Sequence, residues 1–455
     1  MTRTTLRSCS VGERYSLGER PSALAVGAFL VAALLLAGPL SAQEQPLAFQ
    51  GATLVPIAGP PIQDGVLVVH RGEITAVGAA GEVDMPGNAE VRDVSGMYIM
   101  PGMVDTHSHI GGGDGGDRSA PIHGEVRILD ALDARHDRIR TARAGGVTTA
   151  NIMPGSGHLM SGQTAYVKLR DGRTIYDLLL CDDVRTEICG GMKMANGTNP
   201  IGSPPFPETR ARSAALVRAK FVEAQQYAGR VQDANGDPEQ VPARNLELET
   251  LMEILDGRRI VHFHTHRHDD ILTAIRLSEE FGFRVVLHHV SEAAMVAPEI
   301  AAAGVPSSII VIDAPGGKLE AVNLTFDAGA ALEEHGADVA FHTDDPITDS
   351  RVFLRSAGLS VRAGMSREAA LEALTLAGAR MMDLEDRVGS LEVGKDADFV
   401  LLTGDPLSVY TRVQETWIDG IRVFDLDDPE DRAYAVGGYG VTPDQGGHHH
   451  GMGGH

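Results

Sequence analysis

The feature of this sequence that most constrains its fold is a series of histidines placed at the ends of strand-like runs. The first run begins at residue 98 and ends in His107-Ser108-His109. Because side chains alternate between the two faces of a β-strand, His107 and His109 project from the same side, and their ring nitrogens can bind one ion. Three later runs also carry histidine or aspartate at or close to their ends: residues 259–266, 284–291 and 338–345. The pattern predicts a metal site assembled from the ends of several strands.

Three segments resemble those of the amidohydrolase superfamily, in particular its imidazolonepropionase-like and prolidase-like branches. They are residues 101–109, the pair Thr343-Asp344, and the run 389–402, which is similar to the strand that returns the family's chain to a small β-sandwich. The histidines and the aspartate also follow the family's order along the chain. The resemblance implies an α/β fold, a distorted (β/α)8 barrel of the TIM type with a small β-sandwich formed from N- and C-terminal segments.

The resemblance and the pattern of apolar runs together divide the chain into segments. The barrel should occupy residues 97–383, a span compatible with the roughly 250 residues of typical barrels plus insertions. Inside it, residue spacing predicts helices at about 125–144, 208–233 and 245–255, and a strand at 145–152. The other expected segments are a signal peptide at 1–42, the two parts of the sandwich at 43–96 and 384–435, and a Gly/His-rich tail at 436–455.

Residues 1–42 have the composition of a secretory signal peptide. Four arginines precede the apolar run 23–37, and the small residues Ser41 and Ala42 precede a polar stretch. The run is shorter than the 18 or more apolar residues that a membrane-spanning helix usually has, so we expect cleavage near Ala42 rather than an uncleaved anchor. The mature protein is then predicted to be exported, periplasmic or extracellular, with no stable membrane span.

The net charge limits the classes of molecule that the protein can bind, and the cysteines bear on its redox compartment. The formal net charge is −23, which repels phosphate backbones and anionic lipid surfaces, so we expect no nucleic-acid partner. The expected partner is a small-molecule or short-peptide substrate, and homo-oligomerisation is left open. Cys181 and Cys189 follow the signal peptide, and export would place them in an oxidising compartment, where both a disulfide and two unpaired thiols are compatible with the sequence.

The resemblance assigns metal ligands to particular residues. His107, His109 and Asp344 would hold a divalent ion with one position left for water. Lys193, in Met192-Lys193-Met194, is the candidate for the lysine that is carboxylated in the prolidase-like branch and bridges two ions. The alternative is an ordinary loop lysine and a single ion. Clustered imidazoles favour zinc, so one or two Zn²⁺ ions are expected.

Two of the strand-like runs contain more histidines than a metal site needs. His264 is the predicted ligand of the first, because Ile271 follows it at the family's spacing. His266 is predicted to contact substrate or support the ligands, whereas His262 and His268 are interpreted as structural or solvent-facing. In the next run, strand alternation predicts that His288 and His289 point to opposite faces. The sequence His289-Val290-Ser291 resembles that of dihydroorotase relatives, which favours His289 as ligand.

These assignments predict an exported metal-dependent amidohydrolase that cleaves an amide or cyclic amide with metal-activated water. Asp344 would act both as ligand and as the group that carries a proton to the leaving nitrogen, and His266 is the second catalytic candidate. The alternative is a non-catalytic metal-binding protein of the cell envelope that keeps the fold. The presence of Asp344 favours catalysis, because a protein that only binds metal needs no proton shuttle.

Overall fold

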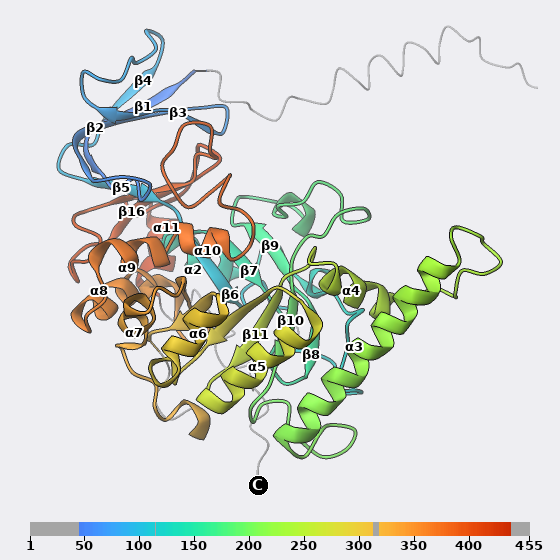
Figure 1. Cartoon of the computed structure of the whole chain (residues 1–455). Coiled ribbons are helices and arrows are strands. Elements are labelled where there is room, and N and C mark those ends of the chain that lie inside the picture. Colours follow the sequence, from blue (N-terminus) through green and yellow to red (C-terminus); the bar gives the residue numbers. More distant parts are fainter. Residues whose placement is uncertain (1–44, 114, 313–317, 438–455) are drawn as a thin grey trace, which may run out of the picture. The chain divides into compact units, whose positions relative to one another are not determined.

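The structure, a computed structural model, describes residues 45–113, 115–312 and 318–437 (Figure 1). The predicted signal peptide and nearly all of the predicted Gly/His-rich tail lie outside these residues. Among the helices that the described ranges contain, none is both long enough and apolar enough to cross a membrane. The predicted boundaries between segments stay predictions.

The first sheet combines strands from two distant parts of the chain. Its order is β17-β16-β15-β5-β1-β2-β3, and β4 pairs with β1. Phe49 and Phe399 come from the two parts and pack edge to face, with their ring centroids 5.1 Å apart, and Trp417 stacks on Phe399. Buried aromatic and aliphatic side chains therefore join the N- and C-terminal strands. The strands are β1 (Leu47–Leu54), β2 (Ile62–His70), β3 (Glu73–Ala79), β4 (Glu90–Asp93), β5 (Tyr98–Pro101), β15 (Phe399–Leu402), β16 (Val413–Ile418) and β17 (Ile421–Asp425).

Two further sheets lie between these segments in the sequence. One has the order β14-β13-β12-β11-β10-β8 and the other β6-β7-β9. Only Thr164 separates β8 from β9, which pair antiparallel with β10 and β7. The opposite edges of the two sheets are β6 and β14, and there Ser108 and Asp345 form a parallel β-bridge. The strands are β6 (Met103–Ser108), β7 (Val147–Ile152), β8 (Met160–Gln163), β9 (Ala165–Lys168), β10 (Met192–Ala195), β11 (Val261–Thr265), β12 (Val285–His289), β13 (Ser307–Ile310) and β14 (Val339–His342).

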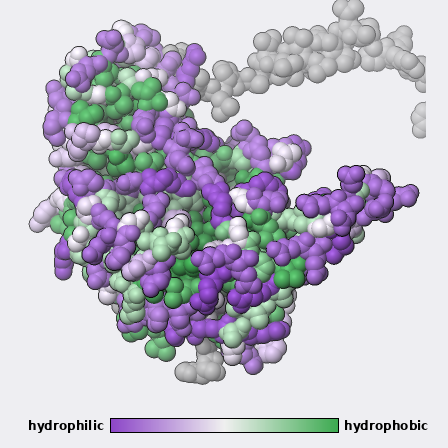
Figure 2. All heavy atoms as spheres, viewed as in Figure 1, coloured by the Kyte–Doolittle hydropathy of each residue, from purple (hydrophilic) through white to green (hydrophobic). Residues whose placement is uncertain are grey.

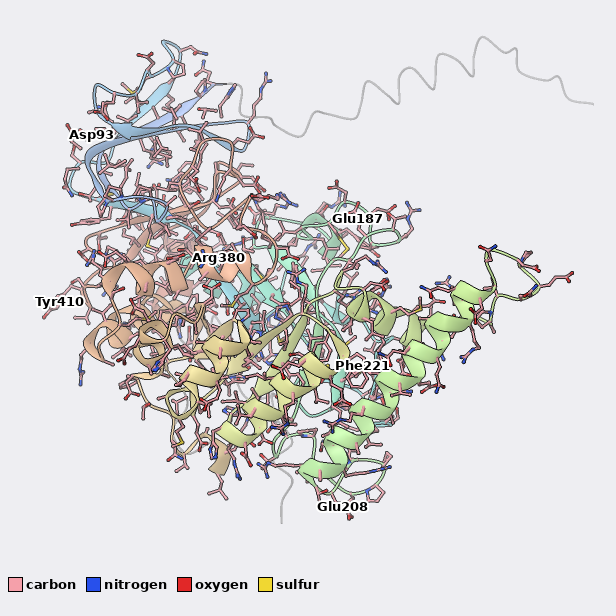
Figure 3. All side chains as sticks on the ribbon, viewed as in Figure 1. Asp93, Glu187, Glu208, Phe221, Arg380 and Tyr410 are labelled. Carbon is pink, nitrogen blue, oxygen red and sulfur yellow. A yellow bond between two sulfur atoms is a disulfide. The ribbon has the colours of Figure 1, made fainter. Side chains whose placement is uncertain are left out.

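Helices connect the successive parallel strands of these two sheets, and α5 packs on β11 (Figure 1). Phe221 of α3 stacks on Phe281 and Phe283, which binds this long helix to the α5 segment (Figure 3). Hydrophilic residues cover much of the face seen in Figure 2. The helices are α2 (Asp137–Ala144), α3 (Arg210–Asp233), α4 (Leu246–Leu255), α5 (His268–Phe281), α6 (Ala297–Ala303), α7 (Ala328–Glu334), α8 (Leu354–Arg362), α9 (Arg367–Ala373), α10 (Leu376–Arg380) and α11 (Pro429–Val436).

The predicted helices α3 and α4 are confirmed, and Thr209 and Asn245 cap their N-termini through side-chain oxygens. The helix predicted at 125–144 is wrong in its first part, where the chain forms only a short 3-10 turn, and α2 begins at Asp137. Two bonds of Asp133 explain this start: its amide donates to the carbonyl of Gly111 in another loop, and its carboxylate accepts from the Arg135 amide. These bonds divert the backbone from the helical pattern.

Cys181 and Cys189 are joined by a disulfide, so the first of the two predicted alternatives is confirmed. Their Cα atoms are 5.2 Å apart, and the bonded pair closes a short loop that leads into β10. The Tyr166 amide donates to the Cys189 carbonyl. The disulfide and this hydrogen bond together hold the segment before β10 next to β9.

Candidate metal centre

The predicted ligands converge because their strands are parallel neighbours. β10, β11, β12, β13 and β14 run parallel to one another, and β6 runs parallel to β7. The carboxyl ends of parallel strands meet at one edge, where α/β proteins usually bind their ligands. His107 and Lys193 lie on β6 and β10, His264 and His289 lie on β11 and β12, and Asp344 lies two residues after the end of β14.

The first group of candidate ligands is His107, His109 and Asp344. Asp344 Oδ1 lies 3.3 Å from His107 Nε2 and 2.9 Å from His109 Nε2, and the two Nε2 atoms are 3.3 Å apart. The Met153 carbonyl accepts a 2.7 Å bond from His109 Nδ1, which directs Nε2 towards Asp344. The structure thus brings together the three residues predicted for one ion.

Lys193 lies beside this group. It occupies strand β10 rather than a loop, its side chain is fully buried, and its Nζ is 2.8 Å from His107 Nε2 and 2.9 Å from Met153 Sδ. Burial lowers the pKa of Lys193 to about 7, although the charge of Asp344 acts in the opposite direction. A lysine with such a pKa is neutral in a substantial fraction of molecules near neutral pH.

The second group consists of His264, His266 and His289. His266 Nε2, His289 Nε2 and His264 Nδ1 are buried and have no hydrogen-bond partner within the described part of the chain. His266 Nδ1 is 2.7 Å from Ser291 Oγ, which fixes the ring and leaves Nε2 turned into the group. The predicted ligands His264 and His289 therefore have a third histidine beside them. His266 was predicted to support catalysis rather than to bind metal.

A third group, His107, His288 and His342, is completely buried. The prediction that His288 and His289 point to opposite faces is wrong, because both rings lie in the interior among the other histidines. The cause is the backbone at the end of β12, where His289 and Val290 have φ values of 71° and 39°. A left-handed backbone interrupts the alternation on which the prediction relied.

The other two histidines of this segment are His262 on β11 and His268 at the start of α5, which were interpreted as structural or solvent-facing. His262 is buried and lies 2.8 Å from Tyr166 Oη and 2.9 Å from His288 Nε2. His268 is half-exposed and lies 2.6 Å from a Glu292 carboxylate oxygen. Neither residue belongs to a candidate ligand group among the described residues.

Electrostatics favour the protonation states that a cation requires. Burial lowers the pKa of His107, His264 and His289 well below the usual value, so these rings are neutral at physiological pH. Burial acts to raise the pKa of Asp344, but the hydrogen bond from His109 and the nearby charges outweigh it and lower the pKa to about 2. Neutral imidazoles and an ionised carboxylate are the forms that coordinate a divalent ion.

Several supporting residues were missed by the sequence analysis. The Asp105 carboxylate accepts bonds from the Thr343 hydroxyl at 2.5 Å and the Thr343 amide at 3.1 Å, and this ties β6 to the end of β14. Asn199 Nδ2 lies 3.2 Å from His264 Nε2. Asp105 and Thr343 are close in sequence to the predicted ligands His107 and Asp344, and this proximity could have identified them as supporting residues. Asn199 and Met153 lie in connecting segments whose paths the sequence does not specify.

Comparison with known proteins identifies the class to which this fold and site belong. The Amidohydrolase family model matches residues 98–423. The chain therefore belongs to the amidohydrolase family, as predicted, and this membership supports a hydrolase that acts on carbon–nitrogen bonds.

Individual relatives agree with this assignment. The crystal structure of an amidohydrolase from Thermotoga maritima matches with a TM-score of 0.76 and 32% identity, covering 83% of this chain and 100% of that one. Amidohydrolase tasK of Hapsidospora irregularis is 30% identical over 81% of this chain, which spans only 41% of that relative. An imidazolonepropionase of Pseudomonas fluorescens is 23% identical, over 83% of this chain and 91% of that enzyme.

Proposed function

We propose that this chain is an exported, metal-dependent amidohydrolase that hydrolyses the carbon–nitrogen bond of a small amide, cyclic amide or short peptide. The observation that carries the proposal is the convergence of His107, His109 and Asp344 beside Lys193, with a second histidine group adjoining them. Family membership supports the hydrolytic chemistry. The similarity to imidazolonepropionases adds ring amides to the substrates worth testing.

The residues present are suited to divalent metal. Three buried ring nitrogens of the second group have no hydrogen-bond partner among the described residues, and such orphaned nitrogens are costly unless something binds them. His107, His109 and Asp344 would hold one ion, and His264, His266 and His289 a second. Zinc suits such imidazole-rich sites best. The neutral form of the buried Lys193 amine is the form that reacts with CO₂, and a carboxylated Lys193 would lie beside the first group.

Each residue has a defined task in this scheme. When bound, the ion supplies Lewis acidity and lowers the pKa of a water molecule towards about 7. Asp344, which is ionised and within 3.3 Å of both histidines, would accept the proton of the attacking water and transfer it to the leaving nitrogen. His109 is kept in orientation by the Met153 carbonyl, and Asp105 holds Thr343 next to the shuttle.

We infer that the sheet β14-β13-β12-β11-β10-β8 and the sheet β6-β7-β9 together form the barrel typical of the family. The consecutive strands β8 and β9 pair with β10 and β7, and thus join the sheets on one side. On the other side, the Ser108–Asp345 bridge and a 2.8 Å bond from the Asp344 amide to the His107 carbonyl bring β6 and β14 together. These links support an eight-position barrel in which β8 and β9 share one position.

Export is supported by the predicted signal peptide and by the Cys181–Cys189 disulfide, since disulfides persist mainly outside the reducing cytosol. Fractionation of cells that express the full chain would test this prediction. A processed protein in the periplasm or medium, with an N-terminus near residue 43, is the expected result. A full-length protein in the cytosol would contradict it.

The activity test is a screen of the zinc-loaded protein against dipeptides, N-acyl amino acids and lactams, with the Asp344→Asn variant as the matched negative control. Hydrolysis of at least one class by the parent, and its loss in the variant, is expected. A protein that retains metal but hydrolyses none of these compounds would favour the alternative of a non-catalytic metal-binding protein.

A further inference from the structure

We propose that Arg138 of helix α2 is a positioning residue that holds Asp344 and His109 in place through an ion pair with Asp345. The proposal deepens the proposed function, because it rests on the assignment of Asp344 and His109 to the metal site. Arg138 contacts neither group itself. It acts on them through the buried side chain and the backbone of Asp345.

The Asp345 carboxylate is almost fully buried, and each of its oxygens is bound. Arg138 Nη1 lies 2.5 Å from Oδ1, and the exposed fractions of the two side chains are 14% and 1%. Oδ2 accepts bonds from the Ser350 amide at 2.9 Å and the Ser350 hydroxyl at 2.7 Å. A buried carboxylate is strongly unfavourable without a cation beside it, and Arg138 Nη1 supplies that cation at Oδ1 of Asp345.

The backbone of Asp345 links this ion pair to the candidate ligands. Its carbonyl accepts a 3.2 Å bond from the His109 amide, and the preceding Asp344 amide donates a 2.8 Å bond to the His107 carbonyl. Asp344 itself has a φ of 52°, a left-handed conformation that a non-glycine residue keeps only when its surroundings hold it. The ion pair at Asp345 is the charged contact that anchors this turn.

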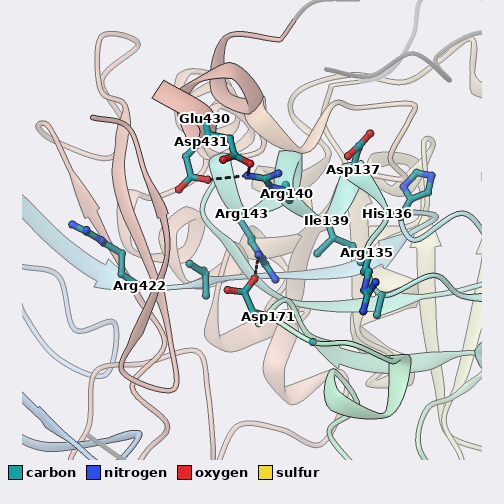
Figure 4. A pocket seen from close by; sticks show the side chains of 13 residues that line it. Arg135, His136, Asp137, Ile139, Arg140, Arg143, Asp171, Arg422, Glu430 and Asp431 are labelled. Atoms are coloured by element: carbon teal, nitrogen blue, oxygen red, sulfur yellow. Dashed lines mark hydrogen bonds and ion pairs between the residues drawn. The ribbon is translucent and has the colours of Figure 1, made fainter. Parts of the chain in front are cut away.

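Helix α2 also supplies a matched control. Arg140 lies two residues further along and pairs with Glu430 and Asp431 of α11, as Figure 4 shows. Its guanidinium packs on the Tyr434 ring, 4.1 Å from the centroid. Arg140→Ala therefore removes an arginine and its ion pairs from the same helix and leaves Asp345 intact. If both variants lose zinc affinity or kcat, the cause is a general disturbance of helix α2. If only the Arg138 variant loses them, the cause is the ion pair with Asp345.

The experiment measures metal binding by titration of the apo-protein with Zn²⁺, followed by kcat and KM of the zinc-loaded protein on the substrate found in the screen. Arg138→Ala should weaken zinc binding, lower kcat, or both, by about 10- to 100-fold, the usual effect of losing a group that orients metal ligands. KM should change little. Arg138→Lys should recover part of the loss, since a lysine can restore the charge opposite Asp345, and Arg140→Ala should behave like the parent.

The proposal is overturned if Arg138→Ala binds zinc and turns over like the parent, or if Arg140→Ala shows an equal loss. Should Arg138→Ala fail to fold, Asp345→Asn tests the same ion pair, because the Ser350 bonds can persist while the charge is removed. Parental zinc affinity and kcat in that variant would also overturn the proposal. A parent that binds zinc without hydrolysing any substrate would refute the proposed function alone, and the zinc titration of the variants would still decide the role of Arg138.

Discussion

Replacement of Asp344 by asparagine separates proton transfer from metal binding. The substitution keeps the shape of the side chain but removes its negative charge and its capacity to accept a proton. General acid–base residues usually contribute about 10²- to 10⁴-fold to the rate, so we expect kcat to fall within that range. The loss should appear mainly in kcat, because contacts made in the ground state survive. The geometry argues for a value in the upper part of the range, since the carboxylate lies within 3.3 Å of both His107 and His109.

The assay is steady-state hydrolysis of the substrate found in the screen, with the zinc content of each preparation measured in parallel. The ring nitrogens of His107 and His109 remain 3.3 Å apart without the carboxylate, and the second histidine group is untouched, so the variant should retain at least one ion. Asp405→Asn, which alters a surface partner of Arg367, is the control for the chemical change itself. Hydrolysis by Asp344→Asn at close to the parental rate would refute the assignment and make His266 the next residue to test.

Three further predictions concern metal content and stability. The His107→Ala/His109→Ala double variant should lose at least one ion, which elemental analysis would detect; unchanged zinc content would contradict the site. Lys193→Ala should lower the metal count from two towards one and be partly rescued by a small carboxylic acid, whereas parental metal content and activity would show that Lys193 is no bridge. Lys168 is buried against Asp398 and two other carboxylates, so Lys168→Met should destabilise the fold by about 3 to 5 kcal/mol in chemical denaturation at pH 8. Burial raises the pKa of Asp398, so Asp398 becomes protonated as the pH falls. The destabilisation caused by Lys168→Met should therefore be smaller at pH 5 than at pH 8. An equal loss of unfolding free energy at both pH values would contradict this reasoning.

The sequence was sufficient to predict which histidines and aspartates lie at the ends of strands. Successive parallel strands place their carboxyl ends at one edge, so His107 and Asp344 could be assigned to one region although they are far apart in the chain. Lys193, in contrast, was assigned only through the resemblance to the prolidase-like branch, and it lies beside His107. The helices α3 and α4 were also predictable, because each has a polar cap and a regular apolar spacing. Both successes depend on patterns that repeat over several residues.

The failures occur where single backbone torsions or distant contacts decide the outcome. The orientation of His288 and His289 was inferred from strand alternation, which does not apply once the backbone at His289 is left-handed. The start of α2 depends on the bond from the Asp133 amide to Gly111, a residue in another loop. The pairing of Arg138 with Asp345 likewise joins residues 207 positions apart, and no local pattern in the sequence marks either as a partner of the other.

The crowding of histidines at this site also affects how variants should be interpreted. His342 has a neighbour at each ring nitrogen, Ser308 Oγ at 2.8 Å and His289 Nδ1 at 3.1 Å. His289 Nε2, in contrast, is buried without a hydrogen-bond partner in the described ranges. This difference supports the proposal that His289 would bind metal and that His342 would orient it, in the way that metal-bound imidazoles are usually held by a second hydrogen bond. Loss of metal in a His342 variant would therefore not by itself make His342 a ligand, because the same loss follows when His289 turns out of position.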